Sequence, residues 1–192
     1  MTVTARTLLE RLAGAELPDW DRFAAGIRRR RLVAGETLFD VERPYPWLVV
    51  VAQGLFKLVY VREDGGERIK SFVGEGSFFA SLSALAPGGR TTFSAIAMTE
   101  GVVDQLDYES LQRHGDRYVE WQRALRVAVQ LYGVRKEKRE RELLVMSAEE
   151  RYRSLLAEDP ALAARVPLKD LALHLGITPV ALSRIRRRMA RS

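Results

Sequence analysis

The sequence predicts an α+β protein in which an antiparallel β-sandwich or barrel is followed by a long helix and a small helical domain. Three observations lead to this prediction. Short apolar segments alternate with glycine-bearing turns between Leu32 and Asp107, which is typical of antiparallel β-structure. After Tyr108 the apolar residues recur at helical spacing. Near the end of the chain, two short amphipathic patterns are separated by Gly176, which predicts two helices joined by a tight turn.

Roughly the first 30 residues predict helices, because their apolar residues follow helical spacing. The run Arg28–Arg31 is interpreted as a solvated stretch ahead of the next domain, without a ligand role. Six apolar segments then predict strands: ETLFDV (36–41), WLVVVAQ (47–53), LFKLVYVR (55–62), ERIKSFV (67–73), TTFSAIAM (91–98) and VVDQLD (102–107). The turn at residues 64–66 predicts a hairpin, since Asp and Gly tolerate positive φ.

The helical segment after Tyr108 has two apolar stripes. The first stripe contains Trp121, Leu125, Ala128 and Tyr132, and the second contains Val127, Leu131 and Val134. A helix with two apolar faces needs two surfaces to pack against, so we expect its own β-domain on one side and a second copy of the chain on the other. We assign the first stripe to the dimer interface. The alternative is one wide stripe buried inside a monomer.

The predicted domain organisation has three parts. Residues 1–108 form the N-terminal helices and the β-domain, residues 109–142 form the long helix, and residues 143–192 form the helical domain. The last domain begins at SAEE (147–150), which fits a capping box because the Ser147 hydroxyl can accept an amide hydrogen bond while Glu150 reaches back.

Charge and composition narrow the function. The formal net charge is +6, and from Val166 to the end the chain has six Lys and Arg residues against one Asp, a net +5. This asymmetry indicates an anionic partner for the C-terminus, most often nucleic acid; a solvated basic tail is the alternative. With no cysteines and two histidines, His114 and His174, we expect neither a metal site nor an enzyme.

No membrane association is expected either. No apolar run approaches the ~20 residues that span a bilayer, and the N-terminus lacks the apolar core of a signal peptide. We therefore expect a cytoplasmic protein.

The most specific signal is KDLALHLGITPVALSRIRRRM, residues 169–189. Its first half predicts a short helix that ends at Gly176, the usual left-handed position after a helix. Thr178 is a good N-cap and Pro179 suits the first helical position, where a missing N–H costs nothing. Leu182, Ile185 and Met189 face the core, while five arginines at 184, 186, 187, 188 and 191 crowd the end of the second helix. Two helices with this turn and a basic outer face predict a helix-turn-helix.

DLALHLGITPVALSRIRRRM resembles the helix-turn-helix of the Crp/Fnr family of bacterial transcription regulators. AGETLF (34–39), VAQGLFKLVYVREDGGERI (51–69) and GEGSFFASLSALAPGGRTTFSA (74–95) resemble the family's β-roll of the cyclic-nucleotide-binding type. The resemblance implies an antiparallel β-roll (a double-stranded β-helix, jelly-roll-like), a long dimerisation helix and a DNA-binding domain. It also implies a homodimer on a pseudo-palindromic site in double-stranded DNA, with RNA polymerase as a further partner.

By this resemblance, Pro179, Val180 and Arg184 occupy base-reading positions, and Lys169 approaches a backbone phosphate. Thr178, Ser183, Arg187 and Arg188 complete the expected DNA-binding set. The sequence ends a few residues after the second helix, so we expect the family's usual β-hairpin wing to be absent, with the Arg186–Arg191 cluster replacing some of its phosphate contacts.

The effector positions depart from the family pattern. Nucleotide-binding members carry a Gly-Glu pair whose carboxylate holds the ribose, and the matching residues here are Ala80 and Ser81. Arg90 and Thr91 do match the pair that holds the cyclic phosphate. Ser81, Arg90 and Thr91 are therefore the candidate effector residues, with Arg90 as an ordinary surface residue an equally good interpretation. We expect a small anionic effector other than cyclic AMP, or none, and no cofactor, because the chain lacks cysteines for an iron–sulfur cluster and convincing haem ligands.

Together these inferences predict that the protein is a sequence-specific DNA-binding transcriptional regulator that acts as a homodimer. The alternative is an effector-sensing module that acts through protein contacts and binds DNA only non-specifically. The effector, the operator sequence and the direction of regulation do not follow from the sequence.

Overall fold

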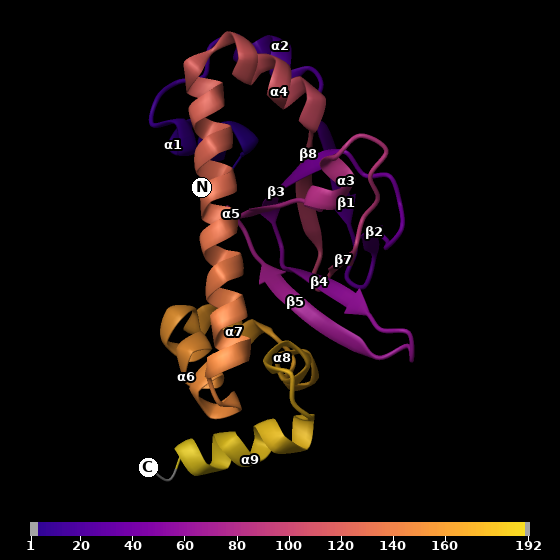
Figure 1. The fold of residues 1–192 in the computed structure, drawn as a ribbon, viewed down its shortest axis with the longest axis vertical. Helices are drawn as coiled ribbons and strands as arrows, with labels where there is room; N and C mark the ends of the chain where they lie inside the picture. Colours follow the sequence, from indigo (N-terminus) through magenta and orange to yellow (C-terminus); the bar gives the residue numbers. More distant parts are fainter. Residues whose placement is uncertain (1–3, 191–192) are drawn as a thin grey trace.

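The computed structural model describes residues 4–190 and has the expected α+β fold (Figure 1). Its strands are β1 (Arg28–Leu32), β2 (Thr37–Phe39), β3 (Trp47–Gln53), β4 (Phe56–Val61), β5 (Glu67–Val73), β6 (Phe78–Phe79), β7 (Ser94–Ala97) and β8 (Gly101–Asp107). Its helices are α1 (Ala5–Ala13), α2 (Trp20–Ala24), α3 (Leu82–Leu85), α4 (Tyr108–Arg117), α5 (Val119–Val145), α6 (Ala148–Glu158), α7 (Pro160–Arg165), α8 (Leu168–Leu175) and α9 (Pro179–Met189). The β-domain lies beside α5. Helices α6, α7, α8 and α9 lie together near the C-terminal end of α5 (Figure 1).

The strands form two antiparallel four-stranded sheets, in the orders β1-β8-β3-β6 and β2-β7-β4-β5. One apolar core fills the space between the sheets and includes Val49 and Val51 of β3. A second core lies on the other face of the first sheet, where Leu48 and Val50 contact the helices α1, α2, α4 and α5. Because both faces of β3 are covered, its sequence WLVVVAQ is a continuous apolar run without alternation.

The turn between β4 and β5 confirms the predicted hairpin. Gly65 has φ +76°, and the Arg62 amide donates to the Gly66 carbonyl at 2.9 Å. The tighter turn between β3 and β4 depends on Gly54, which has φ +91° and where a Cβ atom would lie 2.5 Å from the Glu100 carbonyl oxygen. A side chain at this position would therefore force the neighbouring chain away.

The run Arg28–Arg31 is mostly exposed, as the interpretation of a solvated stretch expects, but it lies within the β-domain and not ahead of it. These residues form β1, which pairs with β8 along its length, for example Arg30 with Val103. Arg29 explains the pairing, because its guanidinium donates to both carboxylate oxygens of the buried Asp104 at 2.8 and 3.0 Å. Arginine is tolerated in this strand because most of its positions are exposed at the edge of the sheet.

The segment expected as one long helix is two helices, α4 and α5, separated by Tyr118 in an extended conformation. The helices cross closely at Gly115, where a Cβ atom would lie 3.2 Å from Leu125 Cδ1. Trp121, at the start of α5, stacks on Trp20 with ring centroids 6.0 Å apart and donates its indole N–H to the Pro18 carbonyl at 2.8 Å. These two contacts pack the N-terminal helices against α5.

This packing corrects the predicted dimer interface. Trp121 and Ala128 are buried within the protomer, and Leu125 packs on the same core. Tyr132 lies further along the same face of α5, half-buried. The stripe that was assigned to a partner chain thus faces the protomer's own β-domain and N-terminal helices, and the second stripe is the one left at the surface.

The C-terminal domain begins as expected. Ser147 and Glu150 form the predicted capping box of α6, and Asp159 caps α7, which begins at Pro160. The apolar core of this domain also contains three residues of the β-domain, Leu55, Phe72 and Met98. The two domains therefore share one core where they meet.

Two ion pairs hold the domains together at this junction. Arg165 binds the Glu75 carboxylate through two bonds of 2.9 Å. Lys57 of β4 lies 3.2 Å from Asp170 of α8, and both side chains are largely buried.

Candidate nucleic-acid interface and ligand cavity

The helix-turn-helix is built from the local signals that predicted it. Helix α8 ends at Gly176, which has φ +75° in the left-handed region. Thr178 caps α9, its hydroxyl accepting the Ala181 amide at 3.2 Å, and Pro179 is the first helical residue. Leu182 and Ile185 are buried against α8 and α6 in the domain core. This burial fixes which side of α9 faces solvent.

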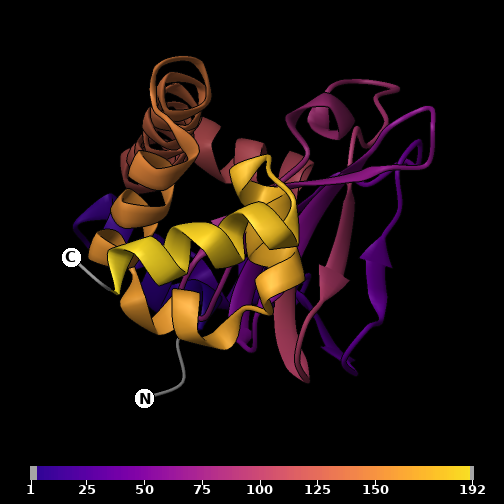
Figure 2. The ribbon, with the colours of Figure 1, turned by 90° about the horizontal axis from the view of Figure 1, so that it is seen from below.

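The outer side of α9 carries most of the predicted DNA-binding residues. Figure 2 shows α9 lying across the end of the molecule, on the side away from the β-domain. Val180 is 62% exposed. The other predicted positions are exposed or, for Ser183, half-buried: Lys169, Thr178, Pro179, Ser183, Arg184, Arg187 and Arg188. The predicted positions are thus at least partly accessible to solvent, and Arg191 lies outside the described residues.

The charge on this surface is largely uncompensated. Within residues 4–190, no carboxylate lies within ion-pair distance of Arg184, Arg186 or Arg187. Arg188 is different, because its guanidinium donates to Glu149 of α6 at 2.7 Å. Arg188 therefore contributes to the packing of α9 on α6, a role that the sequence did not indicate.

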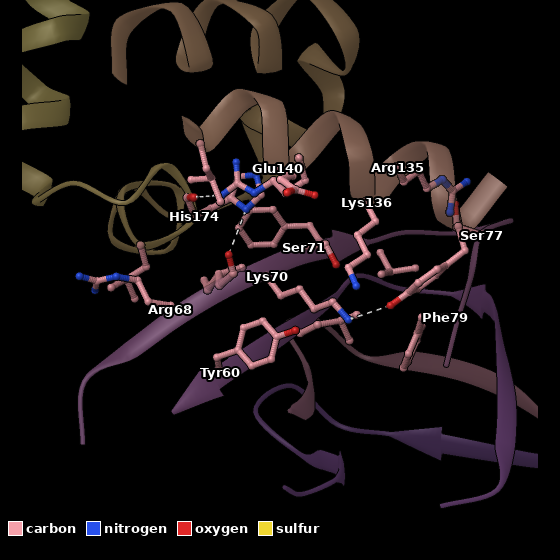
Figure 3. A pocket seen from close by; sticks show the side chains of 18 of the residues that line it. Tyr60, Arg68, Lys70, Ser71, Ser77, Phe79, Arg135, Lys136, Glu140 and His174 are labelled. Atoms are coloured by element: carbon pink, nitrogen blue, oxygen red, sulfur yellow. Dashed lines mark hydrogen bonds between the residues drawn. The ribbon is translucent and has the colours of Figure 1, made fainter. Parts of the chain in front are cut away.

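A cavity of about 880 Å³ lies where β4, β5, α5 and α8 meet (Figure 3). This volume is in the range of small-molecule sites. Most of its wall is apolar, from residues such as Phe72, Phe78, Phe79 and Leu143. Leu173, His174 and Gly176 bring the helix-turn-helix into the same wall. A molecule in this cavity would contact both domains.

Basic side chains converge on the cavity from two sides. Lys70 of β5 and Lys136 of α5 extend toward each other in Figure 3. The Lys70 ammonium lies 3.9 Å from the centroid of the Phe93 ring and donates to the Tyr132 hydroxyl at 3.4 Å. Burial, and then repulsion by Lys136, lowers the pKa of Lys70 from its ordinary value to about 8.

His174 joins this cavity to the domain junction. Its Nδ1 lies 3.2 Å from the Ile69 carbonyl oxygen, and its own carbonyl accepts a hydrogen bond from Arg139 of α5. Burial, and then the Arg139 charge, lowers the pKa of His174 to about 4. The imidazole is therefore neutral at physiological pH and acts as a structural contact between α8 and β5.

The predicted effector residues lie outside this cavity wall. Ser81 and Thr91 are buried, and the Ser81 hydroxyl accepts the Thr92 amide at 3.4 Å. Thr91 donates its hydroxyl to the Asp40 carbonyl and accepts the Arg43 amide at 3.0 Å. Arg90 donates to the Glu42 carbonyl at 2.8 Å. The Thr91 hydroxyl and one guanidinium nitrogen of Arg90 thus donate to the loop at residues 40–43.

Sequence reasoning missed the cavity residues for a physical reason. Lys70 and Lys136 are 66 positions apart in the chain, and a lysine in a strand or in a charged helix is ordinarily solvated. Only the packing of α5 across β5 brings them together. No local pattern could have identified the pair.

Residues 4–190 lack two further features. No group of three or more His, Cys, Asp or Glu side chains there could hold a metal ion. None of the helices in this part of the chain has the length and apolar character of a membrane span.

Similarity to known proteins agrees with this architecture. Residues 29–118 match the sequence profile of the cyclic nucleotide-binding domain family. The structure of FixK2 from Bradyrhizobium japonicum has a TM-score of 0.75 at 21% identity, with 86% of this chain and 85% of that chain covered. The c-di-GMP-responsive regulator CLP from Xanthomonas campestris has a TM-score of 0.70 at 20% identity, with 90% of each chain covered.

A third structure is more similar in sequence. The N-terminal domain of a transcriptional regulator from Streptomyces coelicolor A3(2) is 31% identical, with a TM-score of 0.52, and the match covers 68% of this chain and 94% of that one. No curated protein matches the sequence significantly.

The fold is that of a protein in which a domain of the cyclic nucleotide-binding type is joined by a long helix to a helix-turn-helix domain. Residues 29–118 belong to the cyclic nucleotide-binding domain family, and the chain has the fold of the Crp/Fnr regulators.

Proposed function

We propose that the protein is a sequence-specific DNA-binding regulator that acts as a homodimer on a pseudo-palindromic operator. The main support is the outer face of α9, where Val180 and Arg184 are exposed in the N-terminal half of the helix and Arg187 is exposed further along it. A guanidinium at such a position can bond both acceptors of a guanine edge in the major groove. Arg186 and Arg187, further along α9 and exposed, suit phosphates on either side of the groove.

Dimerisation would use the exposed side of α5. Val127, Leu131 and Val134 lie at steps of four and three residues, and Val134 is 57% exposed. Leu144 and Val145 add to the exposed apolar surface near the end of the helix. Pairing of this stripe with its copy would remove the apolar surface from water and relate two α9 helices by a two-fold axis.

The test is the selection of bound sequences from random duplex DNA, followed by titration of the selected and random duplexes at two salt concentrations. We expect an inverted-repeat consensus and a specificity ratio of at least about 10³. Equal affinity for selected and random duplexes would contradict the proposal and favour the alternative, in which the protein acts through protein contacts and the arginines bind DNA non-specifically.

A further inference from the structure

One carboxylate lies between two arginines where α6 and α9 meet. Glu149, in the first turn of α6, has its Oε2 atom 2.7 Å from the Nη2 atom of Arg188 in α9. Its Oε1 atom lies 2.7 Å from the Nη2 atom of Arg153, one turn further along α6. Both oxygens of a single carboxylate thus contact guanidinium groups from two helices. We call these three side chains the Glu149 triad.

The Glu149 triad lies beside the residues that are proposed to bind DNA. Arg188 belongs to the predicted DNA-binding set, and α9 also carries the exposed Arg184, Arg186 and Arg187. Figure 1 shows α9 below α6, at the end of the molecule opposite the N-terminal helices. Within residues 4–190, Glu149 is the one carboxylate that pairs with an arginine of α9. The triad therefore places a negative charge beside a strongly basic helix.

The exposed fractions of the three side chains indicate what a DNA phosphate could reach. The side chains of Arg188 and Arg153 are 66% and 55% exposed, whereas that of Glu149 is 25% exposed. The two guanidinium groups are therefore accessible from solvent, while the carboxylate is partly covered. Because exposed ion pairs are weak, a phosphate can compete with Glu149 for either arginine.

The folding of α6 and α9 does not depend on this carboxylate. Leu182 and Ile185 of α9 are buried in the core of the C-terminal domain, and Met189 packs on the same core. Helix α6 begins at the capping box of Ser147 and Glu150, in which Glu149 takes no part. Removal of the Glu149 charge should therefore leave both helices in place, so that its electrostatic effect can be measured.

We propose that Glu149 limits the affinity of this surface for DNA of any sequence, because it holds Arg153 and Arg188 in ion pairs and repels phosphates itself. A phosphate that binds either arginine has to displace the carboxylate, and this competition weakens the complex. The effect is independent of sequence, since phosphate contacts carry no sequence information directly. The proposal rests on the proposed function only in taking DNA as the anion.

This role separates affinity from base recognition. Arg184, which is proposed to read a base, has no ion pair within residues 4–190. Loss of the Glu149 charge should therefore tighten the binding of operator and random DNA by similar factors and leave the preferred sequence unchanged. A limit on non-specific affinity is useful to a sequence-specific regulator, because genomic DNA offers a large excess of competing sites.

The experiment measures the affinity of the full-length Glu149→Gln variant for a fluorescein-labelled random duplex by anisotropy, at salt concentrations from about 50 to 200 mM. At the lowest salt concentration we expect binding about three- to tenfold tighter than that of the original protein. The slope of log K against log salt should become more negative by about 1 to 2, because each additional phosphate contact releases counterions. A purely structural role of Glu149 would not steepen this slope.

The matched control is Glu150→Gln, which removes the same charge from the same turn of α6. The Glu150 carboxylate accepts a hydrogen bond from the Ser147 amide at 2.8 Å, and glutamine can keep this bond in a capping box. The control leaves Arg153 and Arg188 paired with Glu149. We therefore expect it to change the affinity for the random duplex by less than about twofold.

A second set of variants tests whether Glu149 acts through the two arginines. Arg153→Gln combined with Arg188→Gln should weaken binding of the random duplex and make the salt slope less steep. In this background Glu149→Gln should tighten binding by less than about twofold, because neither arginine remains to be released. Urea unfolding of each variant, followed by circular dichroism, verifies that the protein is folded.

Four results would overturn the proposal. They are unchanged or weaker binding of the random duplex by folded Glu149→Gln, an equal increase in affinity for Glu150→Gln, the full increase in the background without the two arginines, and no binding of the random duplex by any variant at the lowest salt concentration. Loss of operator preference in the original protein, with the effect of Glu149→Gln intact, would instead contradict the proposed function and support the role of Glu149.

Discussion

Trp121 shows how one buried side chain determines which face of a helix can contact a partner chain. Its ring is buried between Trp20 and Phe23, and its N–H is bonded to Pro18. Helical spacing placed Trp121 correctly in an apolar stripe, but spacing does not reveal what covers a stripe. The covering segment is more than 90 positions earlier in the chain, so only the folded structure could assign this face to the protomer's own core.

Replacing this side chain should therefore weaken the protomer itself. We expect Trp121→Ala to lower the free energy of unfolding by about 3–5 kcal/mol, because a large buried ring is lost and its cavity cannot collapse fully. Urea unfolding monitored by circular dichroism measures the change. A loss below about 1 kcal/mol, together with a change in oligomeric state, would contradict the assignment of Trp121 to the core.

The helix-turn-helix was predictable because its signals are local. Gly176, Thr178 and Pro179 each act through the conformation or hydrogen bonding of their own turn, and the structure places all three as the sequence indicated. The ion pair of Arg188 with Glu149 was not predictable, because it depends on how α9 crosses α6. Lys70 and Lys136 could not be predicted as a pair for the same reason.

Arg184 provides a test of base recognition at the surface. We expect Arg184→Ala to lower affinity for the selected operator by about 1–3 kcal/mol and to relax the preference at one base pair in each half-site. Arg22→Ala is the control, because Arg22 is an exposed arginine on α2 at the opposite end of the molecule. Binding is measured by fluorescence anisotropy. Equal weakening on operator and random DNA would identify Arg184 as a phosphate contact.

At the scale of secondary-structure elements, helix α5 has two apolar sides in different environments. One side packs on the β-domain and the N-terminal helices. The other carries the exposed Leu131 and Val134 and the half-buried Val127. The sequence predicted both stripes and the need for two packing partners. Its assignment of the first stripe to a partner chain is wrong, because helical spacing does not show that the N-terminal helices cover this stripe.

The exposed stripe makes a specific prediction about assembly. We expect Val134→Glu to convert the dimer to monomers at micromolar concentration, because it would bury an unpaired charge in the interface. The matched control is Val61→Glu, at an exposed valine near the tip of the β4–β5 hairpin. Sedimentation velocity distinguishes the two forms. A dimer that persists in Val134→Glu would place the interface elsewhere.

At the scale of the whole molecule, the placement of the C-terminal domain was beyond sequence reasoning. The order of domains follows from the chain, but their contact depends on Lys57 with Asp170 and on Glu75 with Arg165, pairs more than 85 residues apart. Charged residues at these positions look like ordinary solvated ones. The strands were largely predictable, whereas the two-residue strand β6 was too short to give a pattern.

The pair of Glu75 and Arg165 provides a pH-dependent test of this contact. Hydrogen bonding by Arg165 lowers the pKa of Glu75 to about 2, well below the ordinary value of 4.5. A depressed carboxyl pKa stabilises the folded state above pH 4.5, and the contribution is lost as the pH falls from 4.5 toward 2. Because both side chains are about 40% exposed, the contribution should stay below about 1 kcal/mol.

A double-mutant cycle of Glu75→Gln and Arg165→Gln measures this coupling by urea unfolding at pH 7 and again near pH 3. The coupling should fall at the lower pH. The control cycle uses Arg62→Gln and Asp64→Asn, an exposed pair at 2.7 Å within one hairpin. A coupling of Glu75 and Arg165 that is the same at both pH values would contradict the lowered pKa of Glu75.

The apolar core shared by the β-domain and the C-terminal domain limits which domains can be exchanged between this protein and another. Leu55, Phe72 and Met98 complete the core of the helix-turn-helix domain from the β-domain side, so the domain boundary in the sequence is not a boundary in the packing. A chimaera that joins residues 143–192 to another protein's β-domain would leave a gap in the apolar core unless that domain has side chains of matching shape. Natural variation at these three positions is therefore expected to follow variation in α8 and α9. An engineered exchange of the helix-turn-helix domain would have to transfer these three residues with it.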